Sequence, residues 1–202
     1  MNPEQILATI ANEVAVCTKC ALHESRKKSV AGEGPGFHEN EQGRPFVGAS
    51  GKFLDQLLAQ AELTRADVFI CNVVKCRPPE NRDPHPDELS ACGEYLETQI
   101  QAINPSIIVT LGRISMGKFF GNVKISAVHG QMQKVGERFV IPMFHPAAAL
   151  HQPALKPSIL ADFAKLPDLL NEARAALGRS TIVRKNERNV ELHEKPSQLS
   201  LF

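Results

Sequence analysis

Residues 106–120 read SIIVTLGRISMGKFF, and they predict the unit from which the fold is built. The apolar run before Gly112 is typical of a buried strand, and the residues after it are typical of a short helix. Working outward, residues 67–74 (DVFICNVV) predict a strand before a helix at 85–103, and residues 138–144 (RFVIPMF) predict a third strand. Buried strands that alternate with amphipathic helices indicate an α/β protein with a parallel sheet covered on both faces.

The length and composition of the chain suit one globular domain. Its 202 residues are 43% hydrophobic, which is enough to bury an apolar core. No apolar run approaches the length of a membrane span, and residues 1–17 are acidic where a secretory signal has a basic start and an apolar core. We therefore expect a cytoplasmic monomer without a membrane partner. The net charge of +1 neither supports nor excludes DNA as a partner, although Lys75, Arg77 and Arg82 gather in one predicted loop.

A glycine-rich loop lies at residues 31–51, AGEGPGFHENEQGRPFVGASG, with six glycines and two prolines. Glycine permits positive φ and lets a ligand approach the backbone closely, and proline stiffens the path between turns. Such a loop is typical either of a pocket for a flat polar ligand or of a long surface connection. A helix is expected to follow it, with Ser50 as the N-cap.

Four of the five cysteines form a pattern that indicates a metal centre. Cys17 and Cys20 make a C-x-x-C at the end of the first predicted helix, and fifteen residues separate Cys76 from Cys92. In a cytosolic chain such cysteines favour a metal site or buried thiols over disulfides. Four thiolates can hold zinc or a four-iron four-sulfur cluster, and the missing second C-x-x-C favours the cluster. Cys71 alternates with the apolar residues of a predicted strand, so we expect it in the core.

Polar residues follow two of the predicted strands. Asn72 interrupts an apolar run, and its amide offers one acceptor and two donors in a plane, as the Watson–Crick edge of a base requires. His145 follows the strand at 138–144. If the strands are parallel, both residues converge with the glycine-rich loop at one edge of the sheet, where ligand sites form. An exposed turn asparagine and a structural histidine are the alternatives.

Four motifs now carry a family resemblance. GEGPG at 32–36, RPFVG at 44–48, NVVKCRPPENRDP at 72–84 and HPAAAL at 145–150, together with the spacing of the four cysteines, resemble the iron-sulfur uracil-DNA glycosylases called family 4. The resemblance covers residues 5–170. It implies a three-layer α/β sandwich with a central four-stranded parallel sheet and a 4Fe-4S cluster on the four cysteines. It also implies hydrolysis of the N-glycosidic bond of uracil in DNA, which leaves an abasic site for base excision repair.

The resemblance also assigns roles to single residues. It implies that Phe46 stacks on the base, that Asn72 reads its edge, and that His145 faces its O2 side. The expected catalytic residues are His145, Glu33 and Asn72, and the expected uracil pocket comprises Gly32, Glu33, Gly34, Phe46, Asn72 and His145. A donor at O2 would stabilise the charge that grows on the uracil as the bond breaks. A carboxylate can hold the water or stabilise the sugar cation, and Glu33 and Glu39 are the candidates. Leu150 is the candidate wedge.

The end of the chain predicts a separate segment. Residues 158–177 predict helices with a boundary at Pro167 and complete a domain of residues 1–177, whereas residues 178–202 are polar and predict a flexible tail. The tail ends in QLSLF, which resembles the peptide by which bacterial repair proteins bind the DNA polymerase sliding clamp. The anchors would be Gln198, Leu199, Leu201 and Phe202. The alternative is an apolar terminus that packs on its own domain.

Two other hypotheses compete with the glycosylase. A nucleic-acid binding module of this fold would bind uracil-containing DNA and release no base. A zinc-bound scaffold would be colourless, whereas an iron-sulfur protein is brown.

Overall fold

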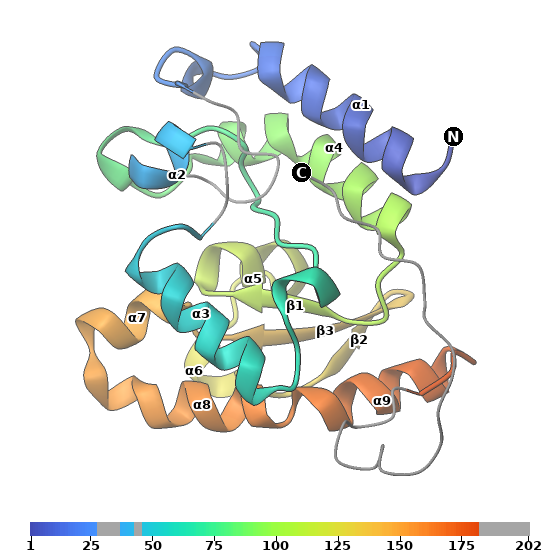
Figure 1. Ribbon diagram of the computed structural model, residues 1–202. Helices are drawn as coiled ribbons and strands as arrows, with labels where there is room; N and C mark the ends of the chain where they lie inside the picture. The colour runs from blue at the N-terminus through green and yellow to red at the C-terminus, as the bar shows by residue number, and fades with distance from the viewer. Residues whose placement is uncertain (28–36, 43–45, 182–202) are drawn as a thin grey trace.

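In the described part of the chain, three short strands form a mixed sheet at the centre of the structure. The computed structural model describes residues 1–27, 37–42 and 46–181. β1 (Ile108–Leu111), β3 (Arg138–Met143) and β2 (Gln133–Val135) lie in the order β1-β3-β2 (Figure 1). β1 runs parallel to β3, and β2 runs antiparallel to β3. The predicted α/β class is confirmed, whereas the prediction of four parallel strands is wrong for the described part of the chain.

A hairpin explains why the sheet is mixed. Only Gly136 and Glu137 connect β2 to β3, and Gly136 has a φ of 61°. Two-residue hairpin connections need positive φ, which glycine adopts without strain. The chain therefore turns back on itself at Gly136, and β2 joins the sheet as an antiparallel strand.

One of the three strands located in the sequence, residues 67–74, is not a strand in the structure. Two of its backbone groups are bound by side chains: Asn72 Oδ1 accepts from the Val73 N–H at 2.7 Å, and Lys75 Nζ donates to the Asn72 carbonyl at 2.7 Å. The Lys75 N–H donates to Cys92 Sγ at 3.4 Å. Side-chain bonds of this kind compete with the hydrogen-bond ladder of a sheet. The apolar run also leaves the Phe69 side chain exposed.

Four helices complete the main core on one side of the sheet. They are α3 (Ala49–Gln60), α7 (Pro146–His151), α8 (Lys156–Ala164) and α9 (Leu166–Ala176). Phe53 and Leu57 of α3 meet Ile141 of β3 and Phe163 of α8 in this core. The predicted helix boundary at Pro167 is confirmed, because Pro167 lies in the first turn of α9.

The start of α3 differs from the prediction. Its N-cap is Gly48, and Ser50 lies inside the first turn without capping the helix. Glycine is among the residues favoured at an N-cap, and the N–H of Gly48 itself donates to a side chain from another segment, Glu39.

α5 (Arg113–Phe120) packs against β1 on the opposite side of the sheet from α8 (Figure 1). The shorter helices are α2 (Phe37–Gln42), α6 (Ile125–Val128), η1 (Ala21–His23), η2 (Arg65–Asp67), η3 (Pro79–Asn81) and η4 (Pro153–Leu155). Of the helices in the described part of the chain, none is long and apolar enough to cross a membrane.

Two helices lie side by side apart from the sheet (Figure 1). They are α1 (Pro3–Val16) and α4 (Pro86–Ile103). Asn2 and Gln5 form a capping box at the start of α1, in which each side chain accepts from the other residue's N–H, at 2.9 and 3.1 Å. Val14 of α1 packs against Tyr95 of α4 in a second core, which also contains the four cysteines. Cys76 of this second core lies four residues after Asn72, which lines the cleft described below.

Candidate active site and metal centre

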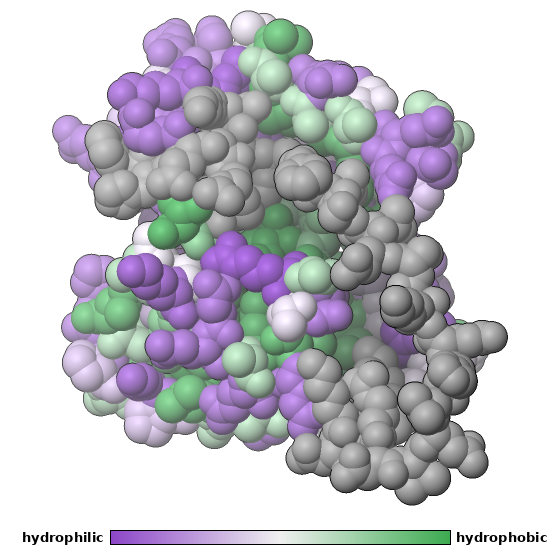
Figure 2. Space-filling model, viewed as in Figure 1, coloured by the Kyte–Doolittle hydropathy of each residue, from purple (hydrophilic) through white to green (hydrophobic). Residues whose placement is uncertain are grey.

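Phe46, Asn72 and His145 lie on the wall of one cleft of about 1370 Å³. They come from the loop before α3, the segment after η2 and the turn between β3 and α7. Figure 2 shows apolar side chains recessed in a hollow between polar parts of one face. The structure thus brings together the candidate site residues that it describes, and their roles stay predictions. The other predicted pocket residues, Gly32, Glu33 and Gly34, lie outside the described residues.

His145 is oriented by the helix that it caps. Its Nδ1 accepts from the Ala147 N–H at 3.1 Å in the first turn of α7. In a neutral imidazole this bond places the proton on Nε2, because one ring nitrogen must accept while the other donates. Gly112 has a φ of 85°, and a Cβ there would come within 3.2 Å of His145 Cβ. The Ala147 N–H therefore favours the tautomer that can donate a hydrogen bond from Nε2, and Gly112 leaves room for the side chain.

Phe46 is held in an unusual backbone conformation. Its side chain is buried, its φ is 52°, and its ring stacks on His145 with centroids 5.6 Å apart at 19°. Arg65 Nη2 donates to the Phe46 carbonyl at 2.7 Å, and Arg65 Nε pairs with Asp55 of α3 at 2.6 Å. A Cβ on Gly51 would lie 1.9 Å from the Phe46 carbonyl oxygen. The arginine and the glycine together allow Phe46 to face the cleft.

Glu39 stabilises the same loop. Its side chain is 9% exposed, and its Oε1 accepts from the N–H groups of Val47 at 3.0 Å and Gly48 at 3.3 Å. The sequence presented Glu39 as a candidate to hold the water or stabilise the sugar cation. The structure gives this carboxylate a positioning contact beside Phe46.

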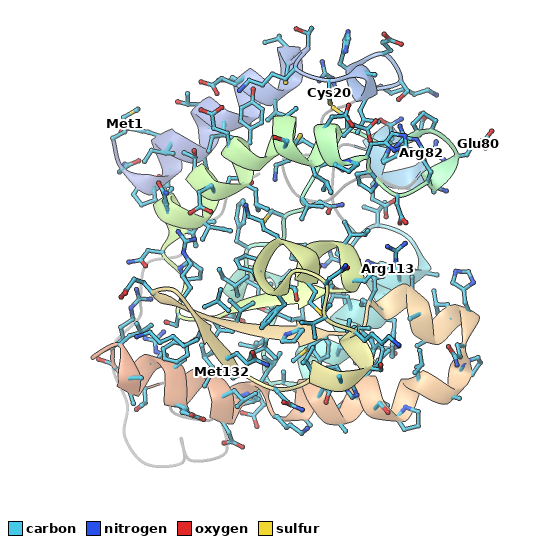
Figure 3. All side chains as sticks on the ribbon, turned by 180° about the vertical axis from the view of Figure 1, so that it is seen from behind. Met1, Cys20, Glu80, Arg82, Arg113 and Met132 are labelled. Atoms are coloured by element: carbon cyan, nitrogen blue, oxygen red, sulfur yellow. The ribbon has the colours of Figure 1, made fainter. Side chains whose placement is uncertain are left out.

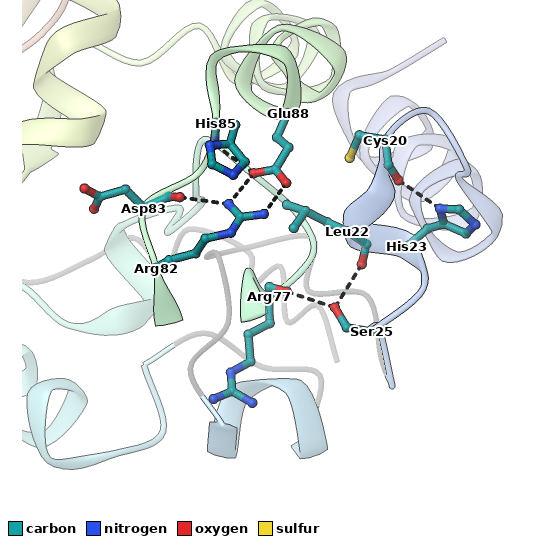
Figure 4. Close-up of polar contacts among 9 residues, drawn as sticks. All are labelled: Cys20, Leu22, His23, Ser25, Arg77, Arg82, Asp83, His85 and Glu88. Carbon is teal, nitrogen blue, oxygen red and sulfur yellow. Dashed lines mark hydrogen bonds and ion pairs between the residues drawn. The ribbon is translucent and has the colours of Figure 1, made fainter. Parts of the chain in front are cut away.

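Two arginines reach the cleft, one from the loop after Asn72 and one from the start of α5. Arg82 and Arg113 both line the cleft, and they lie on the same side of the molecule in Figure 3. Arg82 pairs with the buried Glu88 through two bonds of 2.8 and 2.6 Å, and Glu88 also accepts from the His85 N–H at 2.7 Å (Figure 4). The hydrogen bonds from Arg82 lower the pKa of Glu88 to about 2, against the opposing effect of burial. Arg113 pairs with Asp83.

The predicted metal ligands Cys17, Cys20, Cys76 and Cys92 line one small cavity. Three segments bring them together, namely the end of α1, the loop at residue 76 and the middle of α4. Burial raises the pKa of the Cys76 and Cys92 thiols, while Arg26 opposes the shift at Cys76 and the Lys75 N–H opposes it at Cys92. Cys71 does not line this cavity. It lies half-buried at the cleft wall and packs against the small core of Val73, Leu96 and Ile100, so the expected core position is confirmed in part.

Hydrogen bonds to sulfur test whether these cysteines fit an iron-sulfur cluster. The N–H groups of Lys19 and Lys75 reach Cys17 Sγ at 3.5 Å and Cys92 Sγ at 3.4 Å, and Arg26 Nη1 reaches Cys76 Sγ at 3.5 Å. Such donors stabilise cluster thiolates. Among the residues described here, no three His, Cys, Asp or Glu side chains are arranged to hold a single ion. Four cysteine thiolates that line one cavity and receive such donors are a donor set that a 4Fe-4S cluster can use.

Several residues of the site were not expected from the sequence. Lys75 is fully buried and bonds to Asn72, and burial lowers the pKa of its ammonium while Cys71 and Cys92 oppose that shift. A lysine after an apolar run was a usable signal, although we read it as part of a cationic loop. Nothing in the pattern around Arg65 predicted that it would bind the Phe46 carbonyl.

The family model of the Uracil DNA glycosylase superfamily matches residues 23–172. The chain therefore belongs to the Uracil DNA glycosylase superfamily. It is similar to the type-4 uracil-DNA glycosylase of Archaeoglobus fulgidus, with 41% identity over 85% of this chain and 96% of that protein. Its identity is 44% to the type-4 enzyme of Sulfurisphaera tokodaii, over 81% of this chain and 84% of that protein. Its identity is 39% to the type-4 uracil-DNA glycosylase of Thermotoga maritima, over 84% of this chain and 97% of that protein. The resemblance to family 4 is confirmed.

Proposed function

We propose that the protein is a uracil-DNA glycosylase that hydrolyses the N-glycosidic bond of uracil in DNA. The observation that carries this proposal is one cleft, in a chain of this superfamily, that contains an aromatic ring, a planar amide and an oriented imidazole. Relatives named type-4 uracil-DNA glycosylase over most of the chain support the same activity. The abasic product would enter base excision repair. We propose that the protein acts in the cytoplasm.

Phe46 and Asn72 would select the base. A base must leave the duplex before an enzyme can reach its glycosidic bond. Stacking of a base on an aromatic ring such as Phe46 contributes about 1–3 kcal/mol. The Asn72 amide can donate to uracil O4 and accept from N3–H, whereas cytosine presents the opposite pattern. A buried mismatch of this kind leaves polar groups unpaired and discriminates by about 10⁴ or more.

His145 would stabilise the leaving group. As the bond to the sugar breaks, negative charge grows on the uracil and positive charge on the deoxyribose. The Nε2–H of His145 can donate to O2, and one such donor is worth roughly 10² to 10³ in rate. Glu33 is the carboxylate that we propose for the water or the sugar cation, since Oε1 of Glu39 already binds two backbone N–H groups. Gly32 and Gly34 would line the pocket with it.

We also propose that Cys17, Cys20, Cys76 and Cys92 hold a 4Fe-4S cluster. The shared cavity and the three donors to sulfur support this. The bound cluster would link the end of α1, the loop at residue 76 and α4 covalently through iron. No step of base removal is assigned to it.

The test of the function is release of uracil from an oligonucleotide that contains one uracil. We expect strand cleavage after alkali with the wild type, and a loss of about 10² or more with Asn72→Ala and with His145→Ala. A Lys134→Ala variant, altered on β2 outside the cleft lining, is the control and should behave as wild type. Full activity in both site variants would reject the assigned residues. Brown protein that binds uracil-containing DNA and releases no base would support a binding module instead.

A further inference from the structure

Lys75 contacts both candidate sites at once. Its side chain is 0% exposed, and its ammonium donates to the Asn72 carbonyl and to Gln99 Oε1, both at 2.7 Å. Its own N–H donates to Cys92 Sγ at 3.4 Å. A buried ammonium is costly unless hydrogen bonds satisfy it, so these contacts fix the side chain in place. One residue thus links the residue proposed to read the base to the cysteine site.

We propose that Lys75 is a positioning residue that holds Asn72 in the geometry needed to read uracil, with α4 as its support. The inference rests on the proposed function, which assigns the reading of the base to Asn72. The Asn72 carbonyl is bound by Lys75, and Asn72 Oδ1 is bound by the Val73 N–H at 2.7 Å. The backbone and the side chain of Asn72 are therefore both restrained before any base arrives.

The support for Lys75 comes from one face of α4. Cys92 and Gln99, which bind its N–H and its ammonium, are seven residues apart and so lie two turns apart on the same face. Both side chains are buried. Both contacts come from α4, and Cys92 is also a proposed cluster ligand. The helix therefore holds Lys75 in one position. Because Lys75 is fully buried and bonded to these groups, it acts through Asn72 and not by touching the base.

The test combines Lys75→Met with Asn72→Ala in a double-mutant cycle. The first readout is the ratio of affinities for oligonucleotides with 2′-fluoro-2′-deoxyuridine, which resists cleavage, and with thymine at the same position. The second is uracil release from an ordinary substrate. Lys75→Met should lower the preference for uracil and kcat/KM by about 10- to 100-fold, as loss of a supporting residue does. In the Asn72→Ala background the same substitution should have no further effect, because alanine keeps the bonded carbonyl but lacks the amide side chain that Lys75 positions.

Lys19→Met is the matched control. Lys19 also lines the cysteine cavity, but its ammonium pairs with Glu94 at the surface. It should retain the preference for uracil. Iron content should stay at the wild-type level in both lysine variants, because each keeps the backbone N–H that contacts sulfur. Gln99→Leu is measured alongside, so that failure of Lys75→Met to fold leaves a test. It should give a smaller loss that also vanishes in the Asn72→Ala background.

Three outcomes would overturn the inference. They are an unchanged preference for uracil in Lys75→Met, an equal loss in the presence and absence of the Asn72 side chain, and loss of iron from Lys75→Met. Failure of the proposed function looks different: the wild type would release no uracil, while the binding cycle with the uncleavable oligonucleotide would still report on Lys75.

Discussion

Phe46 illustrates how a few single residues stabilise the backbone conformation of a side chain that faces the cleft. A non-glycine residue in the left-handed region costs about 1–2 kcal/mol, so other contacts must stabilise it. Arg65 binds the Phe46 carbonyl, Glu39 binds the two N–H groups that follow, and Gly51 leaves room for the backbone. Each of these residues acts on the backbone, which is why their roles are invisible in the pattern of side chains.

We predict that Gly51→Ala disrupts the site. The added Cβ would lie 1.9 Å from the Phe46 carbonyl oxygen, so backbone must move. The free energy of unfolding should fall by about 1–3 kcal/mol, as overpacking does. Because the stacking ring moves with its backbone, kcat/KM for uracil release should fall about tenfold or more. Urea unfolding and single-turnover excision measure the two effects.

Gly117→Ala is the control for this substitution. A Cβ at Gly117, inside α5, would meet nothing within 4 Å. Alanine favours a helix by up to about 1 kcal/mol over glycine, so this variant should be as stable as wild type or more so. Equal activity of Gly51→Ala and Gly117→Ala would contradict the role given to the Phe46 backbone.

Glu88 provides a prediction for the dependence of stability on pH. Its pKa is about 2 in the folded protein, against an ordinary value of 4.5, because Arg82 binds the charged form. A lowered folded pKa stabilises the protein above the unfolded value, and this contribution is lost as the pH falls from about 4.5 towards 2. The difference in unfolding free energy between wild type and Glu88→Gln should therefore narrow by on the order of 2 kcal/mol between pH 6 and pH 3.

Urea unfolding at both pH values measures this difference. Glu97→Gln is the comparison, because Glu97 also pairs with an arginine, Arg138, but is half-exposed. A surface pair is worth less, so its difference should change less with pH. A constant difference for Glu88→Gln over this range would show that Arg82 does not stabilise the charged carboxylate.

At the scale of elements, α4 connects the two halves of the site. It carries Glu88, which binds Arg82 of the cleft loop, then Cys92, and then Gln99, which binds Lys75. The buried side chains at positions 88, 92 and 99 lie along one face of α4. The same helix also packs against α1. Any group that fixes α4 relative to α1 therefore also fixes the segment that carries Asn72.

We predict that Cys92→Ala loosens the contact between α4 and α1, whereas Cys71→Ala does not. Cys92 is buried in the four-cysteine cavity, whereas Cys71 lies at the cleft wall. Protein purified without oxygen should lose most of its iron and its visible absorption in Cys92→Ala. Its unfolding temperature should drop by several degrees, because cluster binding adds to folding free energy. Full iron content in Cys92→Ala, or equal loss in both variants, would contradict the proposed ligand set.

At the scale of the whole molecule, periodicity predicted the helices better than the sheet. The helix at 85–103 and the boundary at Pro167 follow from local patterns and are confirmed. The strand at 67–74 failed because Asn72 and Lys75 bind backbone groups that a ladder would use, and such bonds depend on tertiary contacts. The hairpin at Gly136 was not expected, because β2 (Gln133–Val135) is short, polar and mostly exposed and so carries no apolar run that predicts a strand.

The candidate site was predictable from the sequence in its chemically distinctive residues, but not in the residues that support them. Asn72, His145 and the four cysteines were found because their chemistry is distinctive and their spacing resembles a family. The supports Arg65, Gly51 and Gln99 were not found, since an arginine, a glycine or a glutamine in a loop or helix has many ordinary uses. Contacts between distant residues decide those roles, and only the fold supplies them.

The segment at 182–202 provides the last prediction, which concerns the enzyme on long DNA. We propose that QLSLF at its end binds the sliding clamp, with Leu199, Leu201 and Phe202 as apolar anchors in a groove. Deleting residues 182–202 should leave excision from a short oligonucleotide unchanged, because the cleft is built from residues before 182. Excision on circular DNA loaded with clamp should lose any stimulation, because a tether raises the effective concentration to about the millimolar range.

A double substitution, Leu201→Ala with Phe202→Ala, is the matched control for chain length. It should reproduce the deletion on clamp-loaded DNA and behave as wild type on the short oligonucleotide, since only the anchors are lost. Fluorescence polarisation of labelled clamp measures binding directly. Slower excision of the short oligonucleotide by both variants, with unchanged clamp binding, would instead indicate that the apolar end packs on its own domain and supports the cleft.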